Sequence, residues 1–342
     1  MANTVAKKSE LGQQNSFWKK LVGAREFSLF VIIVAFFLFL TFTQDVFLTW
    51  LNLKTMLVSM STTGMTVIAM AFVMLTGGID LAVGATMCLA MAIGAVLFKG
   101  GMNPWVASVI AIFSGVVIGW IQGMLITKIK LIHFIVTMCF MGICRGLVMY
   151  ITKGTPISLV LPLSMEENAA FVKVGQGDLF FTNGIPLPIL IFIAVVIICD
   201  FLLKKSAVCR QIFYTGSNEK AAAYSGIKTD RVKIAVMMIS GFLCGIGGVI
   251  YMVRFSGVPV SAGEGFEMTA IASCVIGGVS MNGGRGTVLG AVLGLTFMTL
   301  ITNAMNLFLV SPTVQELIRY LIVLAAVILD NAQANARAKK LA

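Results

Sequence analysis

The chain has 342 residues, of which 58% are hydrophobic and only 11% are charged, and its mean hydropathy is +0.98. A soluble domain could not bury so much apolar surface, and apolar runs of about 18 residues or more are typical of transmembrane helices. The composition therefore excludes a soluble globular protein and predicts an all-α, polytopic membrane protein.

The net charge of +11 is compatible with nucleic-acid binding, but the distribution of the charge argues against it. The basic residues lie mostly in alternate loops, as the positive-inside rule describes. We therefore assign them to membrane topology and to anionic lipid, and we expect no nucleic-acid partner.

Residues 1–26 are polar and basic and precede the first apolar run. A cleaved signal peptide is the competing interpretation. However, the basic region is long, and the apolar run ends in TFTQD without a small-x-small cleavage site. We predict a cytoplasmic basic tail that is retained.

The apolar runs predict about ten transmembrane helices, some of them broken or short. The predicted segments are 27–43, 55–76, 81–98, 104–127, 131–151, 187–203, 233–253, 268–280, 287–306 and 314–329. They form a transmembrane domain over 27–330, followed by a cytoplasmic tail over 331–342. Placing both termini in the cytoplasm puts most Lys and Arg residues inside, together with the polar loop 204–233, and leaves loop 152–186 outside.

Two breaks, at 77–80 and 281–286, interrupt the apolar pattern. Segment 268–280 would span only about 20 Å, against about 30 Å of hydrocarbon, so it is tilted, re-entrant or shielded by protein. The sequences TGGIDLAVG at Thr76–Gly84 and IGGVSMNGG at Ile276–Gly284 resemble each other. They are either an internal repeat with interrupted helices near a substrate path, or two turns selected for packing.

The loop 204–233 contains a short predicted helix. Asn218 is a good N-cap, Glu219 favours the positive end of the helix dipole, and Gly226 can end the helix. Isolated helices below about 12 residues are marginal in water, so either the flanking membrane segments or a partner protein must hold this one.

No catalytic or metal site emerges from the sequence. His133 is the only histidine, the seven cysteines form no CxxC pair, and the chain lacks a GxxxxGK[ST] phosphate loop. We predict that the chain is not an enzyme, has no catalytic or metal-binding residues and binds no cofactor. Its energy source is an ion gradient or another subunit.

Several polar residues are candidates for a substrate pathway. Neutral polar side chains suit an uncharged, hydroxyl-rich solute, although hydrogen bonding between helices explains them equally well. Asp80 could instead cap the helix that follows it. An ion-coupled secondary transporter remains the alternative, which the few ionisable residues within the helices disfavour. The pathway candidates are Thr76, Asp80, Gln122, Asn303 and Asn306.

The chain resembles the permease subunits of bacterial ABC importers for ribose, xylose, galactose, arabinose and related sugars, including autoinducer-2. Three stretches carry the resemblance: GGIDLAVG at Gly77–Gly84, YTGSNEKAAAYSGI at Tyr214–Ile227 with RVK at 231–233, and AIASCVIGGVSMNGGRG at Ala270–Gly286. Together with the segment count, they cover nearly the whole chain.

The resemblance implies a location in the bacterial cytoplasmic membrane and a set of partners. These are a second permease subunit, identical or related, cytoplasmic ATP-binding subunits that hold ATP and Mg, and an extracytoplasmic sugar-binding protein. It also implies that the short loop helix docks on the ATPase. The family often has Gly where this chain has Ser217, and commonly Arg where it has Tyr224. The implied coupling residues are Gly216, Asn218, Glu219, Ala222, Ala223, Ser225 and Gly226.

Overall fold

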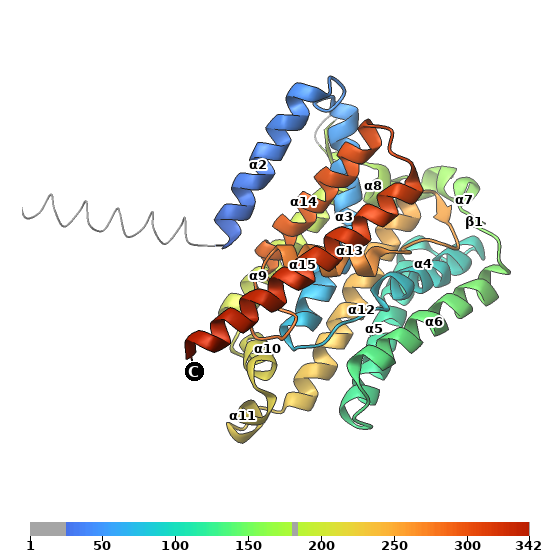
Figure 1. Cartoon of the computed structure of the whole chain (residues 1–342). Coiled ribbons are helices and arrows are strands. Elements are labelled where there is room, and N and C mark those ends of the chain that lie inside the picture. Colours follow the sequence, from blue (N-terminus) through green and yellow to red (C-terminus); the bar gives the residue numbers. More distant parts are fainter. Residues whose placement is uncertain (1–24, 180–183, 342) are drawn as a thin grey trace, which may run out of the picture.

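Apolar helices form most of the protein, and each corresponds to one predicted segment (Figure 1). The computed structural model describes residues 25–179 and 184–341, so most of the predicted tail 1–26 lies outside the described residues. The apolar helices are α2 (Arg25–Thr43), α3 (Trp50–Leu75), α4 (Val83–Lys99), α5 (Pro104–Thr127), α6 (His133–Thr152), α9 (Leu187–Lys205), α12 (Thr229–Arg254), α13 (Phe266–Ile276), α14 (Val288–Leu307) and α15 (Pro312–Leu341).

Eight of these helices, within the described part of the chain, are long and apolar enough to cross a membrane, while α4 and α13 are shorter apolar helices. This confirms the prediction of an all-α, polytopic membrane protein with some short helices. The predicted segment 314–329 and tail 331–342 belong to one continuous helix, α15.

The remaining elements are short and lie in the connections. They are β1 (Ile157–Ser158), α7 (Val160–Ser164), η1 (Glu166–Asn168), α8 (Ala169–Gln176), β2 (Asp178–Leu179), β3 (Ile185–Pro186), α10 (Ala207–Ser217), α11 (Glu219–Tyr224) and β4 (Gly257–Val258). The strands pair antiparallel, β1 with β4 and β2 with β3.

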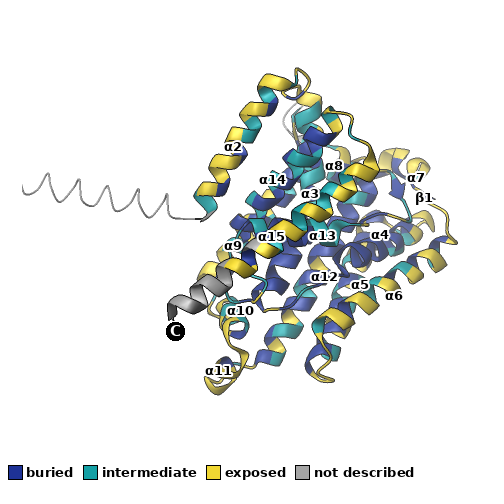
Figure 2. Ribbon diagram, in the orientation of Figure 1, coloured by how far each residue is buried: buried dark blue, intermediate teal, exposed yellow. Residues whose placement is uncertain are grey.

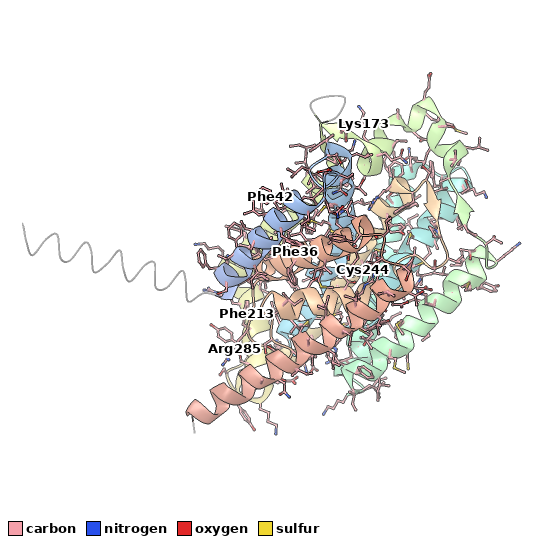
Figure 3. All side chains as sticks on the ribbon, turned by 45° about the horizontal axis from the view of Figure 1, so that its top comes forward. Phe36, Phe42, Lys173, Phe213, Cys244 and Arg285 are labelled. Carbon is pink, nitrogen blue, oxygen red and sulfur yellow. The ribbon has the colours of Figure 1, made fainter. Side chains whose placement is uncertain are left out.

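The core surrounds α3 and α12. Every residue of α3 from Gly64 to Leu75 is buried, as expected for a helix that is apolar on all sides and is enclosed by others. In contrast, α2 and α15 are peripheral and expose apolar faces, as helices that contact lipid do (Figure 2). Phe42 of α2 is 84% exposed, whereas Phe36 on the same helix lies 6.3 Å from the ring of Phe297 in α14 (Figure 3).

The loop 152–186 is attached to the bundle through both polar and apolar contacts. Lys54, near the start of α3, forms an ion pair of 2.6 Å with Asp178. Phe171 of α8 is buried, with its ring 5.3 Å from that of Trp105 at the start of α5. Part of the predicted outer loop is therefore folded onto the helices.

The short helix α13 is shielded by protein. Its 11 residues rise only about 16 Å, and the stretch from Ala270 to Val275 is buried. It packs between α3, α14 and α15, and at its end the backbone of Gly277 lies against that of Gly290 in α14. Of the three alternatives for segment 268–280, the structure supports shielding by neighbouring helices.

Glycines allow α5 and α12 to cross with their backbones in contact. A Cβ atom on Gly115 of α5 would collide with the carbonyl oxygen of Gly241 in α12, and a Cβ on Gly241 would collide with the carbonyl of Gly115. Small residues permit this close approach, which increases the van der Waals contact between helices in a membrane. The backbone of Gly241 is therefore part of the contact surface between α5 and α12.

We expect Gly115→Ala to destabilise the protein by about 1–3 kcal/mol, because the added methyl group overpacks this crossing. Gly146→Ala is the matched control, since a Cβ there in α6 has nothing within 4 Å. Thermal unfolding in detergent measures both variants. Equal unfolding temperatures for the two variants would contradict the close crossing.

Candidate functional site

The predicted short helix of the polar loop is present as α11. The Asn218 Oδ1 atom accepts a hydrogen bond of 3.0 Å from the Ala221 N–H, and Gly226, just beyond the helix, has a φ of +85°. Both features match the predicted N-cap and the predicted end. A position with positive φ favours glycine, because glycine has no Cβ atom that would clash with the backbone.

Sequence reasoning missed α10, which precedes α11. Ser206 is its N-cap and accepts a hydrogen bond from the Cys209 N–H, and Ile212 and Thr215 are buried. The available signal was a serine followed by an amphipathic helical pattern. The polar composition of the loop concealed it.

The helix α11 is held on one side only. The Glu219 carboxylate forms an ion pair of 2.7 Å with Lys233 of α12, and Ala222 is 5% exposed. Because Glu219 is about half exposed, we assign the pair a value of only about 0–1 kcal/mol, so it orients the helix more than it stabilises it. Ala223, Ser225 and Tyr224 are exposed, and α11 lies at the extreme end of the bundle (Figure 2).

The other predicted residue of this loop, Gly216, lies at the C-terminal end of α10. A Cβ atom there would collide with the carbonyl oxygen of Leu75, at the end of α3. The end of α10 therefore contacts the end of α3, immediately before the first break at 77–80.

A polar cavity lies between α3, α13, α14 and α15, in the half of α3 that is distant from this contact. Its volume is about 220 Å³. It is lined by six hydroxyl groups, two amides, two guanidinium groups and four apolar side chains. These belong to Thr55, Ser59, Thr63, Thr269, Thr299, Thr302, Asn303, Asn306, Arg254, Arg319, Met56, Phe266, Leu295 and Met298.

The lining offers hydrogen-bond donors and acceptors but, among the described residues, no carboxylate. In residues 25–179 and 184–341, no group of three or more His, Cys, Asp or Glu side chains is arranged to hold a metal ion. The cavity therefore combines neutral hydrogen-bonding groups with the two positive charges of Arg254 and Arg319.

Two of the five predicted pathway residues, Asn303 and Asn306, line this cavity. Asn303 exchanges two hydrogen bonds with the amide of Asn52, at 2.7 and 3.2 Å. The Asn306 Oδ1 atom accepts a hydrogen bond of 2.9 Å from Gln315. Both side chains therefore also connect neighbouring helices.

The other three predicted residues lie elsewhere. Asp80 is buried, and its carboxylate accepts hydrogen bonds from the Ala82 N–H at 2.9 Å and from the Ser240 hydroxyl at 2.8 Å. It closes the turn before α4, but the N-cap of α4 is Ala82, which has no side-chain cap, so Asp80 does not occupy the predicted N-cap position. The Thr76 hydroxyl donates to the Val73 carbonyl, and Gln122 is buried within α5.

The hydroxyl groups of α3 were overlooked as candidates. Thr55, Ser59 and Thr63 recur every four residues, so they share one face of the helix. That spacing is visible in the sequence. However, the partner helices that complete the cavity are distant in the chain and could not be identified from it.

Comparison with known proteins places the chain among membrane transport components. Residues 52–327 match the family model described as branched-chain amino acid transport system / permease component. No solved structure matches the chain.

Several curated proteins are similar over most of their length. The ribose import permease protein RbsC of Bacillus subtilis (strain 168) is 36% identical over 83% of this chain and 86% of its own. The L-arabinose transport system permease protein AraH of Escherichia coli (strain K12) is 32% identical, over 91% and 92%. The D-allose transport system permease protein AlsC of the same strain is 31% identical, over 96% and 98%.

We expect Asn303→Leu to destabilise the protein by about 1–3 kcal/mol, because it leaves the partly buried Oδ1 atom of Asn52 without its donor, while Asn52 Nδ2 keeps its bond to the Phe47 carbonyl. The double variant Asn52→Leu/Asn303→Leu should recover part of that loss, since neither polar group then remains. Thermal unfolding of the single and double variants measures this. An unchanged unfolding temperature in Asn303→Leu would show that the pair contributes nothing to the fold.

Proposed function

Since the chain belongs to the permease-component family whose model covers residues 52–327, we propose that it is the membrane-spanning subunit of an ATP-driven importer for a sugar or sugar-like solute. The relatives named for ribose, L-arabinose and D-allose support this substrate class. The observation that carries the proposal is the hydroxyl- and amide-lined cavity between α3, α13, α14 and α15.

The chemistry of the cavity favours a sugar over a branched-chain amino acid. A zwitterionic amino acid needs a group that compensates its ammonium, and the lining has no carboxylate among the described residues. Hydroxyl groups and amides can both donate to and accept from sugar hydroxyls, while Arg254 and Arg319 donate to sugar oxygens. Thr76, Asp80 and Gln122 remain candidates for other parts of the path.

The energy source is a separate ATP-binding subunit, which holds ATP and Mg and docks on α11. Its proposed contacts are Gly216, Asn218, Glu219, Ala222, Ala223, Ser225 and Gly226. The exposed side of α11, and its position at the end of the bundle, support this role. The chain itself carries no phosphate loop and is not the ATP-hydrolysing component.

Further partners complete the importer. A second permease subunit, identical or related, shares the membrane with this chain, and an extracytoplasmic binding protein delivers the sugar to loop 152–186. In that loop Val160, Leu161 and Met165 are exposed apolar residues that a partner would cover. The membrane is the bacterial cytoplasmic membrane, with both termini and loop 204–233 inside.

Transport follows from a change in the relative position of rigid parts. ATP binding draws the ATP-binding subunits together, α11 moves with them, and the permease subunits alternately open the path to each side. An ion-coupled mechanism would need an ionisable group free to exchange its ion, whereas the buried Asp80 is engaged in two structural hydrogen bonds.

We expect reconstituted liposomes with the permease, its ATP-binding subunit and its binding protein to accumulate radiolabelled ribose, arabinose or allose only when ATP is supplied. A protonophore should leave the uptake intact, because ATP drives it directly. Sugar accumulation by the permease alone, or its loss on adding the protonophore, would contradict the proposal.

We expect Glu219→Lys to reduce ATP-driven uptake, because it places two like charges where the ion pair with Lys233 orients α11. The double variant Glu219→Lys/Lys233→Glu is the matched control and should restore part of the uptake. Ala222→Trp should also impair uptake, since the buried alanine leaves no space for an indole. Normal uptake in Glu219→Lys and Ala222→Trp, with normal membrane insertion, would show that α11 is not the coupling element.

A further inference from the structure

Three turns from distant parts of the chain meet at one point beneath the helical core. They are the turn after α3 at Leu75–Gly77, the end of α10 at Gly216–Ser217, and the turn between α13 and α14 at Asn282–Gly284. The Gly284 N–H donates a hydrogen bond of 2.9 Å to the Leu75 carbonyl, which joins the two breaks directly. In Figure 3, Arg285 of the second break and Phe213 of α10 are labelled in the same region.

The three turns approach with their backbones, and glycines make this possible. A Cβ on Gly216 would collide with the Leu75 carbonyl and lie 2.7 Å from the Gly284 nitrogen. A Cβ on Gly283 would lie 2.7 Å from the Gly77 nitrogen and 2.8 Å from the Gly216 oxygen. Any displacement of the end of α10 therefore acts on both breaks, because the atoms nearest to Gly216 and Gly283 are backbone atoms, which yield less easily than a flexible side chain.

The contact between the three turns lies close to α11 in the chain. Only Ser217 and Asn218 separate Gly216 from α11, and Asn218 belongs to the hydrogen bonding of both helices. Its N–H donates to the Tyr214 carbonyl of α10 at 3.2 Å, and its carbonyl accepts from the Ala222 N–H of α11 at 2.9 Å. One residue therefore joins the last backbone hydrogen bond of α10 to the first of α11.

Each break is in turn attached to a helix beyond it. In the first break, the Ile79 carbonyl accepts from the Thr137 hydroxyl of α6 at 3.1 Å, and Asp80 binds Ser240 of α12. In the second break, the Met281 N–H donates to Asp330 of α15 at 3.4 Å. Helices α3, α13, α14 and α15 also supply most of the lining of the polar cavity.

We propose that Gly77, Gly216 and Gly284, which we name the glycine junction, are positioning residues for coupling: they transmit the movement of α11 to both broken segments, and so to the helices that line the cavity. This inference rests on the proposed function. Within the similar sequences at 76–84 and 276–284, the contact involves the start of the first, at Gly77, and the end of the second, at Asn282–Gly284.

The test compares Gly216→Ala with Gly142→Ala in the reconstituted importer. Gly142, in α6, has nothing within 4 Å of an added Cβ and is the matched control. We expect Gly216→Ala to lose about fivefold or more of the sugar transported per ATP hydrolysed, the lower end of typical coupling free energies. A loss of packing alone would lower the amount of assembled complex and leave this ratio unchanged.

A double-mutant cycle provides the second measurement, and it decides the question if Gly216→Ala does not assemble. A Cβ on Gly284 would collide with the Ser217 hydroxyl and lie 2.8 Å from the Ser217 N and Cα atoms, and Gly284 has a φ of +71°. Ser217→Gly removes only the hydroxyl clash, so it should rescue only part of the sugar-to-ATP ratio lost in Gly284→Ala. A wild-type ratio in Gly216→Ala, or strictly additive effects in the cycle, would overturn the glycine junction.

The wild-type measurement separates this inference from the function on which it rests. If the wild-type importer does not transport sugar with ATP, the proposed function is wrong. If it does so and the variants behave like Gly142→Ala, the proposed function stands and only the glycine junction is wrong.

Discussion

Backbone hydrogen bonding is the constraint on which this structure depends. In hydrocarbon an unpaired N–H or C=O group costs several kcal/mol, so a helix can break inside a membrane protein only where other protein groups replace its internal partners. The Gly284 N–H obtains its partner from Leu75, and the N–H groups of Gly78 and Val279 turn back to Val73 and Cys274. The helix breaks are therefore stable only because other protein segments enclose them and provide hydrogen-bond partners. A movement of those segments also acts on the breaks.

The same constraint explains where glycine is needed and where it is not. At the crossing of Gly115 and Gly241 and at the contact of Gly216 with Leu75, the backbone itself is the contact surface. Gly142 and Gly146 of α6 have free space around them. Composition alone does not distinguish these two kinds of glycine, because the difference lies in which segment is opposite.

The sequence predicted the helices well because apolar length and N-cap or C-cap residues are local signals. The segments and the helix begun by Asn218 and ended before Gly226 all rest on such signals. The cavity could be predicted only in part. Asn303 and Asn306 line it, but Asp80 is held by Ser240, 160 residues away, and no local pattern reveals that partner. The α10 helix was missed because a polar loop was assumed to lack structure.

The ion pair between Lys54 and Asp178 has a consequence for the whole assembly. It ties loop 152–186 to the start of α3, and the other end of the same uninterrupted helix accepts the hydrogen bond from Gly284. A rigid helix thus joins the two faces of the protein. Linkage between binding sites is reciprocal, so a ligand at either face that favours one position of α3 alters affinity at the opposite face by the same factor. In the proposed importer, binding of the solute-delivering partner would then be thermodynamically linked through α3 to binding of the ATP-binding subunit.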